Sequence, residues 1–90
     1  MIVLQTSKFK RDLKRYKHQK DKIAALGVVI KQLRDTGTVS AEYKPHKLHG
    51  NFQGCMECHI EDNFLLLWID DKTNTIKLLR LGTHHEIFGL

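Results

Sequence analysis

The sequence predicts an α+β domain, with two N-terminal helices packed against an antiparallel sheet of three to four strands and a short C-terminal helical segment. Three observations lead to this prediction. A chain of 90 residues is long enough for one hydrophobic core, so residues 1–90 should form a single domain. Apolar residues recur at helical spacing in the first half and in strand-like runs in the second half. The composition, 41% hydrophobic and 28% charged, is that of an ordinary folded domain.

The first half of the chain predicts a short strand followed by two helices. Residues 2–4 are an apolar run of strand type, and Thr6 or Ser7 offers an N-cap for the next element. Apolar residues then recur at helical spacing in two runs: Phe9, Leu13 and Tyr16, then Ile23, Leu26, Ile30 and Leu33. The second helix should extend from about residue 20 to 34 and end at Gly37.

The second half predicts loops and strands. Residues 36–51 contain Pro45 and several turn-forming residues, which is typical of a loop. The continuous apolar run 64–69 indicates a central strand that is covered on both faces. A turn at 70–74 separates it from a further strand at 75–81, and residues 84–88 form the C-terminal segment.

The net charge of +5 is unevenly distributed. Residues 1–34 hold ten Lys and Arg against two acids, or +8, whereas residues 35–90 hold five against eight, or −3. The basic residues occupy the polar face of the first predicted helix, where Lys14 and Arg15 lie. This asymmetry indicates an anionic partner such as RNA, whose binding should weaken steeply with salt.

Several classes of protein fit the sequence poorly. No apolar run approaches the roughly 20 residues that span a bilayer, and the first residues do not resemble a signal peptide. We therefore expect no membrane partner and a cytoplasmic location. Two cysteines are too few for a disulfide scaffold.

The stretch from Cys55 to His59 matches the c-type haem attachment pattern literally. In a strand, however, Cys55 and His59 would share one face and Cys58 would lie on the other. That geometry disfavours convergence of the two thiols on haem or zinc. A metal or haem protein stays an alternative, but we expect neither a metal nor a cofactor.

Six histidines are about three times the ordinary usage, and five of them follow the basic helices. Histidine can give and accept protons near neutral pH. RNA cleavage needs one group to take the 2′-hydroxyl proton and another to protonate the leaving 5′-oxygen. A cluster of histidines beside a cationic surface is therefore compatible with a nuclease that needs no metal.

Three runs of sequence, in this order, resemble the YafQ branch of the RelE toxins: residues 43–50 (YKPHKLHG), 58–68 (CHIEDNFLLLW) and 80–89 (RLGTHHEIFG). These are the toxin halves of bacterial type II toxin–antitoxin pairs. The resemblance covers essentially the whole chain. It implies a ribosome-dependent mRNA endonuclease that a cognate antitoxin silences. Its expected partners are the ribosome, mRNA and the antitoxin, in a hetero-oligomer with the antitoxin and as a monomer when free.

The resemblance also implies roles for particular residues. His46, His59 and His84 match the catalytic histidines of the family, which share the acid, base and phosphate-stabilising roles. Phe88 matches an aromatic residue that positions or stacks on a base. Phe64, also expected at the RNA, stands where the family usually has tryptophan.

One departure from the family concerns Asn63, which stands where the family has aspartate. An amide takes no proton at neutral pH, but it can bind a histidine or a ribose hydroxyl. We expect Asn63 at the RNA, together with Arg80 as a clamp for the scissile phosphate and Lys14 and Arg15 on the helix. Asn63 also keeps a second hypothesis open, in which a basic module binds the ribosome or nucleic acid and blocks translation without cleaving.

Overall fold

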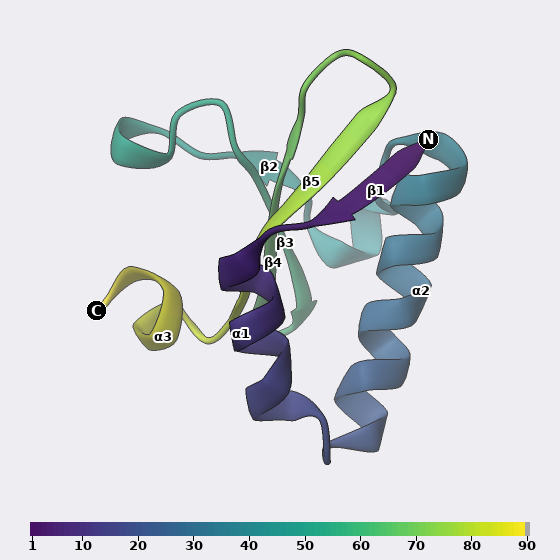
Figure 1. Ribbon diagram of the computed structural model, residues 1–90. Helices are drawn as coiled ribbons and strands as arrows, with labels where there is room; N and C mark the ends of the chain where they lie inside the picture. The colour runs from purple at the N-terminus through teal and green to yellow at the C-terminus, as the bar shows by residue number, and fades with distance from the viewer. Residues whose placement is uncertain (90) are drawn as a thin grey trace.

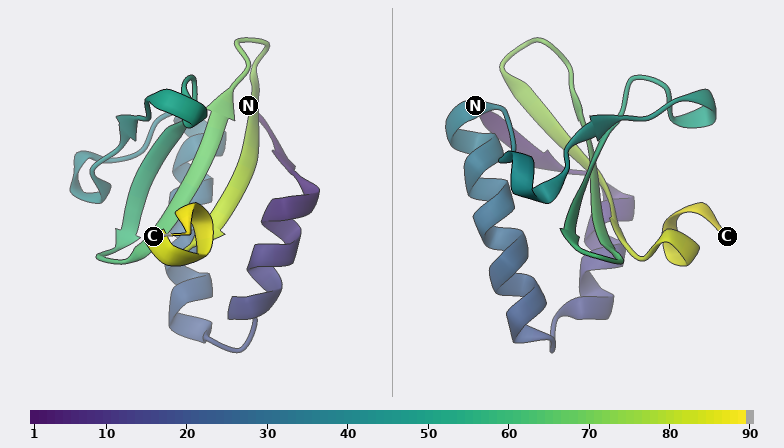
Figure 2. Two further views of the ribbon diagram at one scale, coloured as in Figure 1. Left: turned by 90° about the vertical axis from the view of Figure 1, so that its left-hand side faces the viewer. Right: turned by 180° about the vertical axis from the view of Figure 1, so that it is seen from behind.

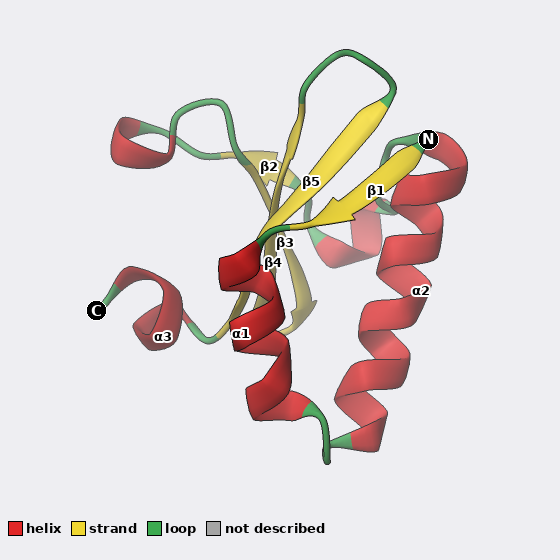
Figure 3. Cartoon of the chain, viewed as in Figure 1, coloured by secondary structure: helices red, strands yellow, loops and turns green. Residues whose placement is uncertain are grey.

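The computed structural model describes residues 1–89, which form one five-stranded sheet with two long helices on one side (Figure 1). The elements follow in the order β1 (Ile2–Gln5), α1 (Ser7–Tyr16), α2 (Lys20–Thr36), η1 (Ala41–Tyr43), β2 (His46–Lys47), η2 (Gly50–Phe52), β3 (Met56–Glu61), β4 (Phe64–Asp70), β5 (Thr75–Gly82) and α3 (His84–Phe88). The α+β class is confirmed, with the helices and strands segregated along the chain as expected (Figure 3).

The sheet has more strands than predicted and is mixed rather than antiparallel. Its order is β1-β5-β4-β3-β2, and β1 pairs in parallel with β5, Ile2 lying opposite Thr75. β1 can be parallel because α1 and α2 intervene before the chain enters the sheet again. β2 has only two residues, in a segment where the sequence predicted a loop. Two residues are too few to show a strand period, so this strand was missed.

Helix α1 begins, and helix α2 ends, at a residue that the sequence predicts. Thr6 caps α1, its Oγ1 accepting a hydrogen bond from the Phe9 N–H (3.2 Å) and donating one to the Leu78 carbonyl (2.8 Å). Helix α2 ends at Gly37, whose φ of +76° suits a residue without a Cβ. The Thr6 bonds therefore join the start of α1 to β5.

The main core lies between the two helices and one face of the sheet. Phe9, Leu26, Val29 and Leu33 from the helices pack there against apolar strand residues. Strand β4 is covered on both faces, as its continuous apolar run predicts, and residues 64–68 are all buried.

The opposite face of the sheet has a smaller apolar cluster. Leu65, Leu67 and Ile87 are buried there, and further side chains from α3 and from residues 48–52 pack against them. The left view of Figure 2 looks onto this face, with α3 in front of the sheet and α2 behind it. Only part of this face is covered, and polar side chains of β2 and β3 occupy the rest.

Within residues 1–89, no helix has both the length and the apolar character required to cross a bilayer.

Candidate active site

Three of the six histidines lie in one row on the less covered face of the sheet. His46 comes from β2, His59 from β3 and His84 from the first turn of α3. Ring centroids are 5.9 Å apart between His46 and His59, and 5.9 Å apart between His59 and His84. Phe88 extends the row at 6.2 Å from His84, and Phe52 packs edge-on against Phe88 at 4.9 Å. The fold thus brings together residues from three separated segments.

Strand register explains how His46 and His59 meet. His46 lies directly opposite Glu57 in the antiparallel β2–β3 pair, and His59 is two residues further along β3. Residues two apart on a strand share a face, so all three side chains emerge on the same side. Leu67 and Leu65 of β4 lie opposite Glu57 and His59 in the sheet and contribute to the apolar floor.

Glu57 is the site residue that the sequence reading missed. Its side chain is only 5% exposed, and its Oε1 lies 3.2 Å from His46 Nε2 and 3.4 Å from His59 Nε2. Its spacing of two from His59 in a predicted strand could have revealed it. A buried carboxylate is rare unless it is paired. Here the Glu57 carboxylate is paired with both His46 and His59.

A backbone carbonyl orients the His46 ring. His46 Nδ1 lies 2.8 Å from the Lys44 carbonyl oxygen, which can only accept a hydrogen bond. Nδ1 therefore carries the hydrogen, and Nε2 is directed at Glu57. Lys44 has a left-handed backbone (φ +53°) at the end of the 3₁₀ turn η1 that leads into β2.

Asn63 orients the His84 ring in a similar way. Its Oδ1 accepts a hydrogen bond from the His84 backbone N–H (3.0 Å) and lies 2.9 Å from His84 Nδ1. Because a backbone N–H is always a donor, the amide atom facing it must be the oxygen, so His84 Nδ1 must also donate. His84 Nε2 is then the ring atom left for proton transfer. Asparagine accepts both of these bonds without the charge of an aspartate.

The start of α3, which carries His84, is held from two sides. Thr83 and Glu86 form a capping box, in which each side chain bonds the other's backbone N–H. Glu86 also accepts a hydrogen bond from the hydroxyl of Tyr16 on α1. Gly82 has φ +148°, and a Cβ there would lie 2.6 Å from Glu86 Oε1. A residue without a Cβ is therefore needed directly before this turn.

This contact shifts the pKa of both partners. Burial and the hydrogen bond to Glu86 raise the pKa of Tyr16 well above its usual value. Burial alone would raise the pKa of Glu86, but the hydrogen bonds from Tyr16 and the Thr83 backbone outweigh it and lower that pKa. Both shifts preserve a neutral phenol that donates to a charged carboxylate at neutral pH.

Arg80 lies near α3, but its guanidinium is engaged inside the protein. Nε donates to Asp12 Oδ2 (2.7 Å), and one terminal nitrogen contacts Asp12 Oδ1 (3.3 Å) and the Glu86 carbonyl (3.2 Å). The Leu81 N–H also donates to Asp12 (3.0 Å). Burial alone would raise the pKa of Asp12, but these bonds and the nearby positive charges outweigh it and lower that pKa. These contacts make Arg80 a link between α1, β5 and α3, and its role as a phosphate clamp stays a prediction.

Phe64 is not available to RNA, contrary to the expectation from the sequence. Its side chain is 1% exposed, at the start of β4. Its ring packs against Tyr16 at 4.7 Å between centroids, and the Lys22 ammonium lies 4.9 Å from its centroid. A ring enclosed in the core cannot stack on a base.

The two helix residues expected at the RNA differ in their surroundings. Lys14 is exposed on the basic face of α1. Arg15 is 44% exposed and forms ion pairs with Asp12 (3.1 Å) and, more loosely, Glu86 (3.9 Å). Arg15 therefore belongs both to the basic surface and to the polar network beneath it.

The cysteines do not form a metal or haem site. Cys58 is buried in the main core, where burial raises the pKa of its thiol to about 12, and Cys55 is half-buried; both are free. His59 emerges on the opposite face from Cys58, as strand alternation predicts. In the described chain, the one group of potential ligands close enough to share an ion is His46, Glu57 and His59.

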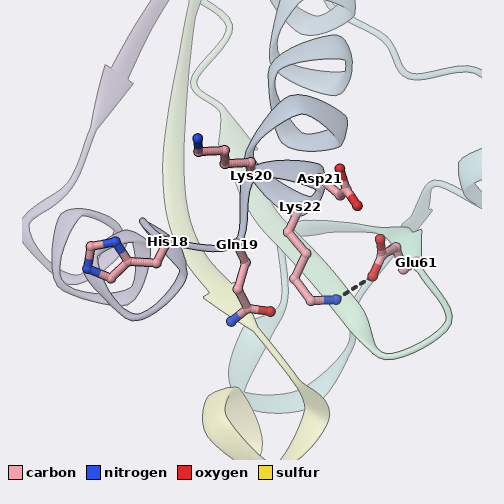
Figure 4. A pocket seen from close by; sticks show the side chains of 6 residues that line it. All are labelled: His18, Gln19, Lys20, Asp21, Lys22 and Glu61. Carbon is pink, nitrogen blue, oxygen red and sulfur yellow. Dashed lines mark hydrogen bonds and ion pairs between the residues drawn. The ribbon is translucent and has the colours of Figure 1, made fainter.

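A separate surface hollow lies where α1 turns into α2. It is lined by His18, Gln19, Lys20, Asp21, Lys22 and Glu61 (Figure 4). Lys22 forms an ion pair with Glu61 across it, and the His18 ring is directed away from that pair. None of the histidines of the row lines this hollow.

Comparisons with known proteins first define the class. A metal-bound toxin from Helicobacter pylori has the same fold, with a TM-score of 0.85 and 30% sequence identity over 98% of this chain and 99% of that one. The toxin in the Escherichia coli DinJ–YafQ complex superposes with a TM-score of 0.83, at 24% identity, over 97% of each chain. The fold is therefore that of small bacterial toxins.

The family follows from the sequence comparison. Residues 1–89 match the model of the family described as the bacterial toxin of type II toxin–antitoxin systems, YafQ, and the chain belongs to this family. It is 28% identical to the mRNA interferase toxin YafQ of Escherichia coli strain B, over 93% of this chain and 91% of that protein. The match to the strain K12 toxin of the same name is 33% identical but spans only 63% of this chain and 61% of that toxin.

Proposed function

We propose that this protein is a ribosome-dependent mRNA endonuclease that inhibits translation and is silenced by a cognate antitoxin. The observation that supports it most is the row of His46, His59 and His84. The three rings lie close enough to act on one phosphodiester, and His84 is held with Nε2 available. The mRNA interferase name of the Escherichia coli relatives agrees with this activity.

The proposed reaction is attack of a ribose 2′-hydroxyl on the adjacent phosphorus. A histidine acting as base removes the hydroxyl proton, and the new P–O bond forms as the bond to the 5′-oxygen breaks. A second histidine protonates the leaving oxygen, giving a 2′,3′-cyclic phosphate and a 5′-hydroxyl. The third stabilises the additional charge on the phosphate. No step requires a metal ion.

Two further features fit an RNA substrate. Phe88 lies beside His84 at the end of the row and is half-buried, so part of its ring is open to stacking on a base. The basic face of α1, with Lys14, supplies phosphate contacts to ribosomal RNA. A cognate antitoxin would form the hetero-oligomer, and the free toxin would be a monomer.

Primer extension on mRNA from translating ribosomes tests the proposal. Induction of the parent protein should arrest growth and produce new 5′ ends in mRNA. The His59→Ala and His84→Ala variants should produce none at equal protein levels, whereas His18→Ala, altered outside the row, should behave as the parent. Arrest without new 5′ ends would instead support the blocking module.

A further inference from the structure

We propose that a hollow between the start of α1 and the 3₁₀ turn η2 binds the base of one mRNA nucleotide next to the scissile bond, and that it prefers guanine or uracil. The proposal rests on the function proposed above, but nucleotide binding can be tested without cleavage. The hollow is lined by Thr6, Ser7, Lys8, Phe52, Leu67, Leu79 and Arg80.

The hollow continues the row of candidate catalytic residues. Phe52 forms one wall, and its ring packs edge-on against Phe88 with 4.9 Å between the centroids. Phe88 in turn lies 6.2 Å from His84. Leu67, in the floor, belongs to the apolar cluster on the sheet face that carries the row. An RNA strand whose scissile phosphate lies at His84 therefore has a neighbouring base within reach of the hollow.

The size and the apolar lining suit a flat aromatic base. The hollow has a volume of about 420 Å³, within the roughly 300–1,000 Å³ that is usual for ligand pockets. Leu67 is buried, and Leu79 and Phe52 are half-buried, so both of the latter offer apolar surface to an occupant. Single-stranded RNA is commonly bound by stacking of its bases on aromatic side chains. Phe52 is the aromatic residue that lines this hollow.

The polar groups at the rim determine which base fits best. Arg80 uses Nε and one terminal nitrogen to bond Asp12 and the Glu86 carbonyl, whereas its other terminal nitrogen has no hydrogen-bond partner within residues 1–89. Lys8 is exposed beside it. Lysine and arginine only donate hydrogen bonds. Guanine and uracil present a carbonyl oxygen where adenine and cytosine present an amino group, so the rim favours the first two.

Charge also favours RNA over a protein side chain as the occupant. Of the described residues that line the hollow, two are cationic and none is acidic. An apolar side chain from a protein partner would cover the free nitrogen of Arg80 without bonding it, and covering an unbonded donor is costly. A nucleotide supplies an acceptor for Arg80 from its base and a phosphate for Lys8 at the exposed rim.

Titration of the free protein with single nucleotides, followed by the NMR signals of the backbone amides, tests binding. Guanosine and uridine 5′-monophosphates at millimolar concentration should shift the signals of Ser7, Lys8 and Leu79. Adenosine and cytidine 5′-monophosphates should do so more weakly. The Lys14 signal, on the basic face outside the hollow, should respond equally to all four because they share the phosphate. Phe52→Leu, which keeps an apolar wall without the ring, should weaken binding by about 5-fold or more.

Three outcomes would contradict the proposal. Unshifted signals of Ser7, Lys8 and Leu79 with all four nucleotides would overturn the subsite. Equal shifts with all four would overturn the base preference. Shifts of these signals that depend on protein concentration, without any nucleotide, would show that a second copy of the chain occupies the hollow instead.

Cleavage on purified ribosomes tests whether the hollow acts on the substrate. In mRNAs that differ only at the nucleotide before or after the cut, guanine or uracil at one of these positions should raise the cleavage rate by about 5-fold or more. Lys8→Ala should reduce this preference. Lys10→Ala, which removes the same charge from the same helix outside the hollow, should keep it. Equal preference in the parent and Lys8→Ala would overturn the role of Lys8, and absence of all cleavage would refute the proposed function but not the nucleotide binding.

Discussion

The hydroxyl of Tyr16 donates a hydrogen bond to the carboxylate of Glu86 and thereby joins α1 to α3, 70 residues further along the chain. Glu86 is also the third residue of α3 and forms the capping box of that helix with Thr83, and His84 occupies the first turn. The position of a candidate catalytic histidine therefore depends on a side chain from the N-terminal helix.

Replacement of this tyrosine should affect both stability and cleavage. Tyr16→Phe keeps the ring against Phe64 but removes the donor, which costs about 1.5–3 kcal/mol for a bond to a charged group. For a domain of this size each kcal/mol lowers the melting temperature by roughly 4–8 °C. We expect the turnover of cleavage to fall at a temperature where the variant is fully folded. Tyr43→Phe, in a half-buried tyrosine elsewhere, is the control, and full turnover in Tyr16→Phe would contradict the positioning role.

Stability should decrease in acid because of Asp12 and Glu86. Both carboxyls have a pKa below their ordinary values of 3.8 and 4.5 in the folded protein. Groups with a lowered folded pKa stabilise the protein above the unfolded pKa, and this contribution is lost as pH falls through the folded value. Urea unfolding at pH 7 and at pH 3 should show this loss as a lower free energy of unfolding at pH 3. In Asp12→Asn the difference in unfolding free energy between the two pH values should be smaller. An equal difference in Asp12→Asn would exclude Asp12 as a cause.

The raised pKa of Tyr16 predicts a corresponding loss in alkali. A group with a raised folded pKa stabilises the protein below its unfolded pKa, here 10.0, and the contribution is lost as pH rises beyond it. Unfolding free energy should therefore decline above about pH 10 in the parent and less steeply in Tyr16→Phe. Identical curves would show that the phenol is not linked to folding.

The Asp12–Arg80 pair should behave as a structural unit. Arg80→Gln leaves Asp12 buried without its main partner, and removal of one member of a buried pair typically costs about 3–5 kcal/mol. The double variant Asp12→Asn/Arg80→Gln should cost less than the sum of the two single changes, as measured by urea unfolding. Additive costs would mean that the two side chains are not coupled.

Asn63 is expected to orient His84 rather than to transfer a proton. Asn63→Asp preserves both hydrogen bonds to His84, so we expect its cleavage rate to change by less than about 10-fold. Asn63→Ala removes both bonds and should reduce the rate by more, because the ring loses its tautomer and position. Single-turnover cleavage on ribosomes measures both. A gain of 10²-fold or more in Asn63→Asp would show that the aspartate of the family transfers protons.

The sequence predicted elements with a strong local period but not those that depend on tertiary contacts. The Thr6 cap, the Gly37 terminus and the buried strand at 64–69 all follow from local chemistry. The parallel pairing of β1 with β5 has no local signal, because the partners are more than 70 residues apart.

The residues of the candidate site also divide into those that the sequence predicted and those whose roles depend on tertiary contacts. Motif resemblance selected the three histidines that the structure places in one row. It gave no indication that Asp12 engages Arg80 or that Phe64 faces the core. Glu57 was missed because a lone glutamate in a strand is ordinarily a surface residue, and only pairing with β2 places it between two histidines.

The basic face of α1 should be separable from the site. Lys14 is exposed, so Lys14→Glu should weaken ribosome binding without a large change in stability. Arg15→Glu should weaken binding and also destabilise the protein, because Arg15 pairs with the buried carboxylate of Asp12. His84→Ala should bind ribosomes as the parent does but fail to cleave. Binding measured at several salt concentrations should show a smaller salt slope for Lys14→Glu, since one phosphate contact fewer releases fewer counterions. An unchanged salt slope would mean that the basic face of α1 contacts something other than RNA. The other polyanion that the charge of this face would attract is an acidic segment of the antitoxin.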